Sequence, residues 1–206
     1  MHCNKEPARI TVRQQLLRLT AALALSAALG LPSLAHAAGQ KVFLIRGFAN
    51  VFSPGIDLLA SELQARRINV ETSNHLSWGT TASEAIEGCR SGKISSIVLV
   101  GHSLGGAAVV DVAKRLQEAG MRVALMVTLD PVSAGQAPGN VRKLENYYLS
   151  TGIGSSIKTD NGFRGQLQNV DVSKRPGVDH VAMTTMPDLH RRIIADIAAS
   201  SGIPCR

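Results

Sequence analysis

Aromatic side chains are scarce in this sequence. Phe, Trp and Tyr together make up 3% of the 206 residues, and Trp78 is the single tryptophan. A broad platform of aromatic rings that would stack against sugars is therefore not expected. Runs of Lys or Arg interleaved with aromatic residues, the pattern typical of nucleic-acid binding, are also missing. The sequence thus argues against nucleic acid as a partner.

Cysteine is equally rare, with three residues in the chain. No Cys-x-x-Cys pair and no cluster of His and Cys at metal-ligand spacing occurs, so no metal site is predicted. Cys3 lies near the start of the chain, which leaves Cys89 and Cys205 as an even pair. In an oxidising compartment such a pair predicts a disulfide, and two buried thiols are the alternative.

Long hydrophobic runs are lacking as well. The longest, residues 19–31, is interrupted by Pro32, whereas a membrane-spanning helix needs about 20 apolar residues. A basic segment precedes this run and Ala35-His36-Ala37 follows it, the pattern that a secretory signal peptidase recognises. We therefore expect residues 1–37 to be a signal peptide and residues 38–206 to be one exported domain, periplasmic or secreted, with no stable membrane span after cleavage.

The positive charge of the protein is modest once the signal peptide is set aside. That segment carries four basic residues and one acidic residue, so its removal lowers the formal net charge from +7 to +4. A small positive surplus is an ordinary feature of a soluble surface. It does not indicate an acidic partner.

Short apolar runs alternate with amphipathic segments through residues 38–206. This order predicts a single α/β domain, a sandwich with a mostly parallel central sheet and helices on both faces. Residues 96–100 are too apolar for a strand exposed on one face, so this strand should be central. The other predicted strands are residues 41–45, 69–72, 122–129, 146–149 and 167–172, and the predicted helices are residues 54–67, 105–120 and 189–197.

Two details of the chain between the first strands are also predicted. Ser53-Pro54 is typical of a helix start, with Ser53 as the N-cap residue and Pro54 at the first helical position. Residues 73–81 are predicted to form a loop. Because His75 and Trp78 lie in it, we expect this loop to supply part of a substrate-binding wall.

The five residues Gly101-His102-Ser103-Leu104-Gly105 join the central strand to the helix after it. A sharp strand-to-helix turn exposes a serine hydroxyl at the edge of the sheet, and the small flanking residues relieve its crowding. The N–H groups of the following helix would point at an oxyanion formed there. The placement of this motif predicts that Ser103 is a nucleophile.

The sequence Gly-His-Ser-Leu-Gly-Gly at residues 101–106 resembles the nucleophile elbow of lipases, esterases and thioesterases in the α/β-hydrolase superfamily. The small size of the chain is similar to that of minimal lipases and cutinases, which have little or no lid. The resemblance implies catalysis through a Ser, acid, His triad, in that order along the chain. It implies no metal and no cofactor.

Two histidines follow the elbow and could serve as the base. His180 lies in the loop after the last predicted strand, from which a side chain can reach the carboxyl edge of the sheet. His190 falls within the last predicted helix, where it is expected to pack. We therefore predict His180 as the base. His102 is next to the serine in sequence, but its side chain should point away from it.

The predicted acid is Asp130, which ends the strand after the nucleophile strand, in Leu129-Asp130-Pro131. This position resembles that of the acid in pancreatic-type lipases. Pro131 favours an extended backbone at Asp130. Asp160 and Asp171 are alternatives, in which case Asp130 would only cap a turn.

The oxyanion hole should combine the backbone N–H of Leu104 with that of a residue after the first strand. Related enzymes usually have His-Gly at the second place, whereas this chain has Arg46-Gly47, which makes Phe48 the expected donor. Because a backbone N–H is what binds the oxyanion, the change of His to Arg does not remove the donor.

These residues predict a serine hydrolase that cleaves carboxylic esters or thioesters through an acyl-enzyme. The expected substrate is a small-molecule or lipid ester, and a monomer is expected. Acyl transfer to an alcohol by the same triad is one alternative. A non-catalytic binding protein on a hydrolase fold is another, since fold does not imply function.

Overall fold

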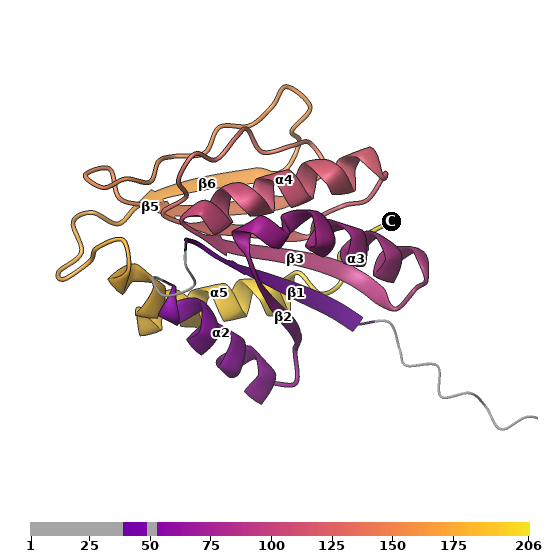
Figure 1. The fold of residues 1–206 in the computed structure, drawn as a ribbon, viewed down its shortest axis with the longest axis horizontal. Helices are drawn as coiled ribbons and strands as arrows, with labels where there is room; N and C mark the ends of the chain where they lie inside the picture. Colours follow the sequence, from indigo (N-terminus) through magenta and orange to yellow (C-terminus); the bar gives the residue numbers. More distant parts are fainter. Residues whose placement is uncertain (1–38, 49–52) are drawn as a thin grey trace, which may run out of the picture. The chain divides into compact units, whose positions relative to one another are not determined.

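The computed structural model describes residues 39–48 and 53–206, and residues Ala37–Arg206 form one compact unit. The predicted signal peptide lies outside the described residues. The domain is built on a six-stranded sheet with the strand order β2-β1-β3-β4-β5-β6, in which every pair of neighbours is parallel (Figure 1). The predicted fold class, a parallel α/β domain with helices on both faces, is confirmed.

Strands and helices alternate along the chain as far as β4, whereas β4, β5 and β6 follow one another without a helix between them. No helix in the described part of the chain combines the length and apolar character needed to cross a membrane. The strands are β1 (Gly39–Arg46), β2 (Asn69–Asn74), β3 (Ile94–His102), β4 (Leu125–Leu129), β5 (Lys143–Tyr148) and β6 (Gln166–Asp171). The helices are α2 (Pro54–Ala65), η1 (His75–Ser77), α3 (Trp78–Arg90), α4 (Leu104–Glu118), η2 (Ala182–Thr185) and α5 (Pro187–Ala199).

Two hydrophobic cores lie on the two faces of the sheet. Successive side chains of a strand point to opposite faces, so Phe43 packs with α3 and α4 while its neighbour Leu44 packs with α2 and α5. The central strand β3 is buried at all but one of its positions. This explains why residues 96–100 are apolar on both faces.

The parallel arrangement places the carboxyl ends of all six strands at one edge of the sheet. Ser103 directly follows β3, and Asp130 directly follows the neighbouring strand β4. Side chains from these two strand ends therefore lie close together. This is the edge at which parallel α/β sheets bind ligands.

The largest departure from the predicted elements is at residues 73–81. The structure has η1 and then the helix α3 from Trp78 onward, where a loop was expected. The side chain of Asn74 caps η1 by accepting hydrogen bonds from the N–H groups of Leu76 and Ser77. The prediction was wrong because the buried face of α3 consists of small residues, which produce no apolar periodicity.

The Cys89–Cys205 disulfide predicted from the sequence is present, with Cα atoms 6.3 Å apart. It lies at the amino edge of the sheet, where the N–H of Cys205 donates to the carbonyl of Ser95 at 2.8 Å. The bond thus joins the C-terminus of α3 to the C-terminal tail, at the end of the domain opposite Ser103.

The double change Cys89→Ser and Cys205→Ser should destabilise the domain by about 2–4 kcal/mol, because it frees a loop of 116 residues in the unfolded chain. Denaturant unfolding of the wild type and the double variant measures this difference. Reduction with dithiothreitol should lower the free energy of unfolding of the wild type and leave that of the double variant unchanged. Two free thiols in wild-type protein purified under oxidising conditions would contradict the prediction.

Candidate active site

Ser103 occupies a strained turn between β3 and α4. Its φ of 58° and ψ of −124° lie outside the regions that most L-residues adopt. Such strain persists only where the surrounding structure holds it, and it is concentrated at functional positions. The turn leaves Ser103 8% exposed, at the carboxyl edge of the sheet.

The glycines on either side of Ser103 are required by close packing. A Cβ on Gly101 would lie 2.1 Å from the carbonyl oxygen of Gly105, and a Cβ on Gly105 would lie 2.1 Å from that of Ile45. Neither backbone atom can move away without displacing β1 or α4. Gly101 is therefore required by a contact within the motif, and Gly105 by its contact with β1.

The loop after β1 lies against the serine. A Cβ on Gly47 would be 2.8 Å from the Cβ of Ser103 and 3.3 Å from its Oγ. Phe48, the expected oxyanion donor, follows Gly47 directly, and Leu104 is the first residue of α4, whose N–H has no partner within the helix. The two predicted donors thus belong to the two segments that adjoin Ser103.

Asp130 and His180 form a direct pair. The distance from His180 Nδ1 to Asp130 Oδ2 is 2.6 Å, and a carboxylate oxygen can only accept, so Nδ1 carries the proton. Asp130 is fully buried, and its other oxygen accepts the N–H of Leu149 at 2.9 Å. This arrangement leaves Nε2 of His180 as the proton acceptor.

The backbone of Asp130 differs from the extended form predicted from Pro131. Its φ is 42°, in the left-handed region. Hydrogen bonds on both sides hold this turn, since the N–H of Asp130 donates to Tyr147 at 2.7 Å and the carbonyl of Pro131 accepts from Ser155 at 3.2 Å. The turn directs the carboxylate of Asp130 toward His180.

The alternative acids have other partners. Asp160 accepts the N–H of Gly162, which closes a turn. Asp171 is exposed and accepts hydrogen bonds from Ser150 and Ser173, which lower the pKa of its carboxyl. Neither hydrogen bonds to a histidine within the part of the chain that the structure describes.

His190 is a buried packing residue. It is 2% exposed, and its Nε2–H donates to the carbonyl of Thr184 at 2.6 Å. Its Nδ1 lies 3.4 Å from a carboxylate oxygen of Glu62 on α2. His190 therefore joins α5 to η2 and α2.

The side chain of His102 points away from Ser103, as predicted, into a buried position. Its Nδ1 lies 2.8 Å from Ser53 Oγ, and its Nε2 lies 2.8 Å from the carbonyl oxygen of His180. Burial lowers the pKa of His102 to about 4, and the adjacent His180 adds to this effect. The imidazole of His102 is neutral at neutral pH.

Ser53 departs from its predicted role as a helix cap. Its side chain makes no capping hydrogen bond, although its backbone carbonyl accepts the N–H of Ile56. The Ser53 hydroxyl bonds to His102 and accepts the N–H of Gly47 at 3.1 Å. The sequence holds no signal for this contact, because Ser-Pro at a helix start is already accounted for by capping.

No hydrogen bond joins Ser103 Oγ to His180 among the hydrogen bonds of the described residues. Hydrogen bonds between a nucleophile and its base are often long without substrate and shorten when substrate binds. In this structure His180 is held by Asp130, and Ser103 is held separately by the turn between β3 and α4.

Two hollows adjoin the candidate triad. One, of about 280 Å³, is lined by His180, Asp179 and the segment Leu149–Ile153. The other, of about 260 Å³, is lined by His75, Trp78 and Leu104, and His75 also contacts the carbonyl of Gly47 at 3.2 Å. The structure thus brings both predicted wall residues, His75 and Trp78, to a hollow next to Leu104.

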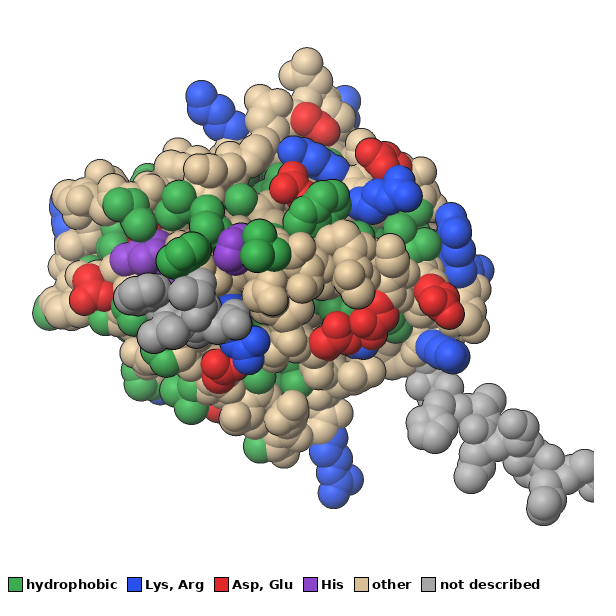
Figure 2. Space-filling view, in the orientation of Figure 1, with side chains coloured by type: hydrophobic (Ala, Val, Ile, Leu, Met, Phe, Trp, Pro, Cys, Tyr) green, Lys and Arg blue, Asp and Glu red, His purple; other side chains and the backbone are tan. Residues whose placement is uncertain are grey.

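Exposed apolar side chains lie around the same edge. Phe48 is 63% exposed, Leu76 80% and Ile153 68%. Figure 2 shows hydrophobic side chains beside two histidines that reach the surface on this face of the domain. The surroundings of the site are therefore largely apolar.

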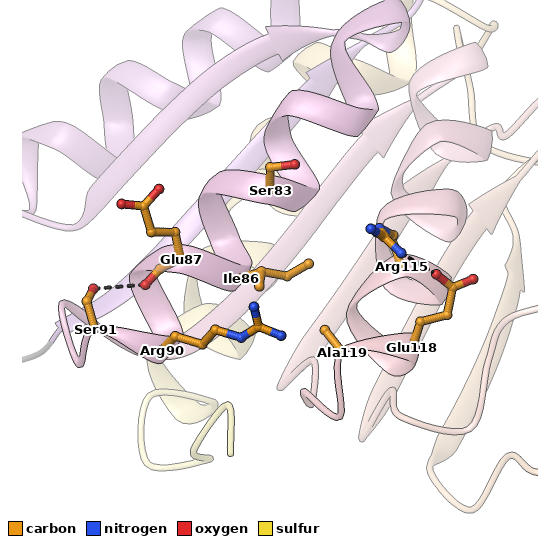
Figure 3. A pocket seen from close by; sticks show the side chains of 8 residues that line it. All are labelled: Ser83, Ile86, Glu87, Arg90, Ser91, Arg115, Glu118 and Ala119. Atoms are coloured by element: carbon orange, nitrogen blue, oxygen red, sulfur yellow. Dashed lines mark hydrogen bonds and ion pairs between the residues drawn. The ribbon is translucent and has the colours of Figure 1, made fainter.

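Another hollow, of about 660 Å³, lies elsewhere, between the C-terminal halves of α3 and α4 (Figure 3). Its charged side chains include the Arg115–Glu118 ion pair of α4, at 2.7 Å. No histidine lines it, and it is at the end of α4 opposite Ser103. Its lining residues are Ser83, Ile86, Glu87, Arg90, Ser91, Arg115, Glu118 and Ala119.

The described residues thus combine a parallel sheet, a serine at the strand-to-helix turn after its central strand, and an Asp–His pair at the same edge. A solved structure with a similar chain is a provisionally assigned hydrolase of the α/β superfamily from Xanthomonas campestris pv. campestris, at a TM-score of 0.44 and 14% identity. The match covers 76% of this chain and 98% of that one. No protein-family model and no curated protein matches this chain.

Proposed function

We propose that this protein is an exported serine hydrolase that cleaves carboxylic esters or thioesters through an acyl-enzyme. The observation that carries the proposal is the 2.6 Å contact between buried Asp130 and His180, at the sheet edge where the strained turn presents Ser103. In the neutral imidazole, a buried carboxylate that accepts Nδ1–H selects the tautomer whose Nε2 can accept a proton, as a general base requires.

The reaction would proceed through two acyl transfers. Nε2 of His180 takes the proton of Ser103 Oγ as this oxygen attacks the carbonyl carbon, and the N–H groups of Leu104 and Phe48 bind the oxyanion. His180 then gives the proton to the departing alcohol or thiol. Water, deprotonated by His180, then attacks the acyl carbon, and His180 returns this proton to Ser103 Oγ as the bond from Oγ to the acyl carbon breaks and the acid leaves.

The surface around the site supports an apolar acyl group. The leaving group must lie within reach of His180, since it receives the proton from Nε2. The acyl chain would then extend the other way, toward the hollow lined by Trp78, Leu104 and Leu76. A small-molecule or lipid ester is the substrate class that fits these side chains.

Export and a monomeric state belong to the same proposal. The signal-peptide pattern of residues 1–37 supports export, and the Cys89–Cys205 disulfide is of the kind that persists in an oxidising compartment. Sedimentation of the protein without residues 1–37 tests the monomer.

The test is a panel of p-nitrophenyl esters and acyl thioesters of graded chain length. We expect hydrolysis with a preference for chains longer than acetyl, since each buried methylene contributes about 0.8 kcal/mol. Trp78→Ala should lower kcat/KM on an octanoyl ester by about tenfold or more and leave the acetyl ester nearly unchanged.

The matched control is Leu167→Ala, because Leu167 is 38% exposed on β6 and Trp78 is 39% exposed. This variant should retain the wild-type chain-length profile. A wild-type protein that hydrolyses no member of the panel and is not labelled by a fluorophosphonate would refute the proposed function. A rate increase with added alcohol, accompanied by ester synthesis, would indicate acyl transfer instead.

A further inference from the structure

A chain of hydrogen bonds connects three segments of the candidate site through buried side chains. His102 and Ser53 are both fully buried. The carbonyl of His180 can only accept, so the Nε2 of His102 carries its proton and Nδ1 accepts from the hydroxyl of Ser53. The Ser53 oxygen in turn accepts the N–H of Gly47. Every donor and acceptor in this chain is thereby assigned.

The three segments are those that supply the chemistry. Gly47 precedes Phe48, the proposed oxyanion donor, and His102 precedes Ser103. The third is His180 itself, held through its backbone carbonyl. The ring of His102 also lies 4.6 Å from the ring of His180, tilted by 39°. A displaced His102 would therefore disturb the base both through its backbone and through its ring.

The neutral state of His102 is what this arrangement needs. A protonated imidazole would donate from Nδ1, and the Ser53 hydroxyl would lose its acceptor. The charged or titratable groups that act on His102 are His180 and Asp130, and burial outweighs the attraction of the Asp130 carboxylate. The hydrogen-bond directions therefore hold throughout the neutral pH range.

We propose that Ser53 and His102 are positioning residues of the active site. Through their hydrogen bonds they hold Gly47 and the backbone of His180 at fixed positions relative to Ser103. This inference rests on the proposed hydrolase function. Misplacement of reacting groups by about 1 Å can lower a rate on the order of 100-fold. The effect should fall on kcat, because neither side chain reaches the hollows in which substrate would bind.

The kinetic test compares variants that remove the hydrogen-bonding groups of these side chains with conservative variants that keep them. Ser53→Ala and His102→Leu should lower kcat by tenfold or more and change KM by less than threefold. Ser53→Thr keeps the hydroxyl, and His102→Gln keeps one donor and one acceptor, so both should recover most of the rate. Fluorophosphonate labelling should be slower in Ser53→Ala and His102→Leu than in Ser53→Thr and His102→Gln.

Two control variants match the burial and bonding of these residues elsewhere in the domain. His190→Gln alters a buried histidine that donates to a backbone carbonyl, and Ser96→Ala removes a buried hydroxyl from β3. Both should lower the melting temperature without changing kcat of the folded protein. The proposal is wrong if Ser53→Ala and His102→Leu also keep kcat within twofold of the wild type. It is equally wrong if Ser53→Thr and His102→Gln are as slow as Ser53→Ala and His102→Leu.

A second readout does not depend on activity. In ¹⁵N NMR of the imidazole nitrogens, His102 of the wild type should appear as the neutral Nε2–H tautomer at pH 6–8. Ser53→Ala should shift the imidazole signals of His180 and the amide signal of Phe48, whereas Ser96→Ala should shift neither. Unchanged His180 and Phe48 signals in Ser53→Ala would overturn the inference. Shifted signals in a protein that hydrolyses nothing would overturn only the proposed function.

Discussion

Ser103→Ala should abolish hydrolysis while the domain stays folded. Without Oγ no acyl-enzyme forms, and loss of the nucleophile from a triad lowers kcat on the order of 10⁴- to 10⁶-fold. The hydroxyl of Ser103 makes no hydrogen bond to the described residues that alanine would lose, so its removal should leave β3 and α4 intact. Release of p-nitrophenol, fluorophosphonate labelling and the melting temperature measure the three consequences.

Ser96→Ala provides the control for this variant. Ser96 lies on the same strand, is fully buried, and donates to the carbonyl of Ser200 near the amino edge of the sheet. It should retain activity and labelling at a somewhat lower melting temperature. Wild-type rates in Ser103→Ala would move the nucleophile to another residue and refute the central claim.

The parts of the fold that were predictable are those in which local pattern and burial agree. The strand β3 and the helix α4 are a continuous apolar run followed by an apolar face at helical spacing, so their type and order follow from the sequence. The helix α3 was not predictable in this way. Its buried face is Thr81, Ala82, Ala85, Gly88 and Cys89, and such small residues form a helix here because α4 packs closely against them.

In the candidate site, too, the features that follow from local sequence pattern or strand order could be predicted, and a contact between distant side chains could not. The position of Ser103 on the strand-to-helix turn could be predicted because the motif is local, and the proximity of Asp130 and His180 because the carboxyl ends of parallel strands meet at one edge. The hydroxyl of Ser53 could not, because its partner His102 is distant in the sequence and the capping role explained it locally. Likewise Pro131 did not hold Asp130 in the extended form, because the N–H of Asp130 donates to Tyr147 and the carbonyl of Pro131 accepts from Ser155.

Asp130→Asn should lower kcat on the order of 10³- to 10⁴-fold with little change in melting temperature. Asparagine keeps the size of the side chain, and its oxygen can still accept the N–H of Leu149. Its amide nitrogen would face Nδ1 of His180 and donate to it, so the proton of the imidazole would move to Nε2. A protonated Nε2 cannot accept the proton of Ser103, so the rate falls although the side chain keeps its size and packing.

Asp160→Asn and Asp171→Asn are the controls, since each replaces a turn-forming carboxylate that has no histidine partner among the described residues. Both should retain nearly full activity. If Asp130 only capped a turn, its change to Asn would instead lower stability by about 1 kcal/mol and leave kcat intact. An active Asp130→Asn beside an inactive Asp160→Asn or Asp171→Asn would place the acid later in the chain. His180 would then have to reach that carboxylate by leaving its 2.6 Å contact with Asp130.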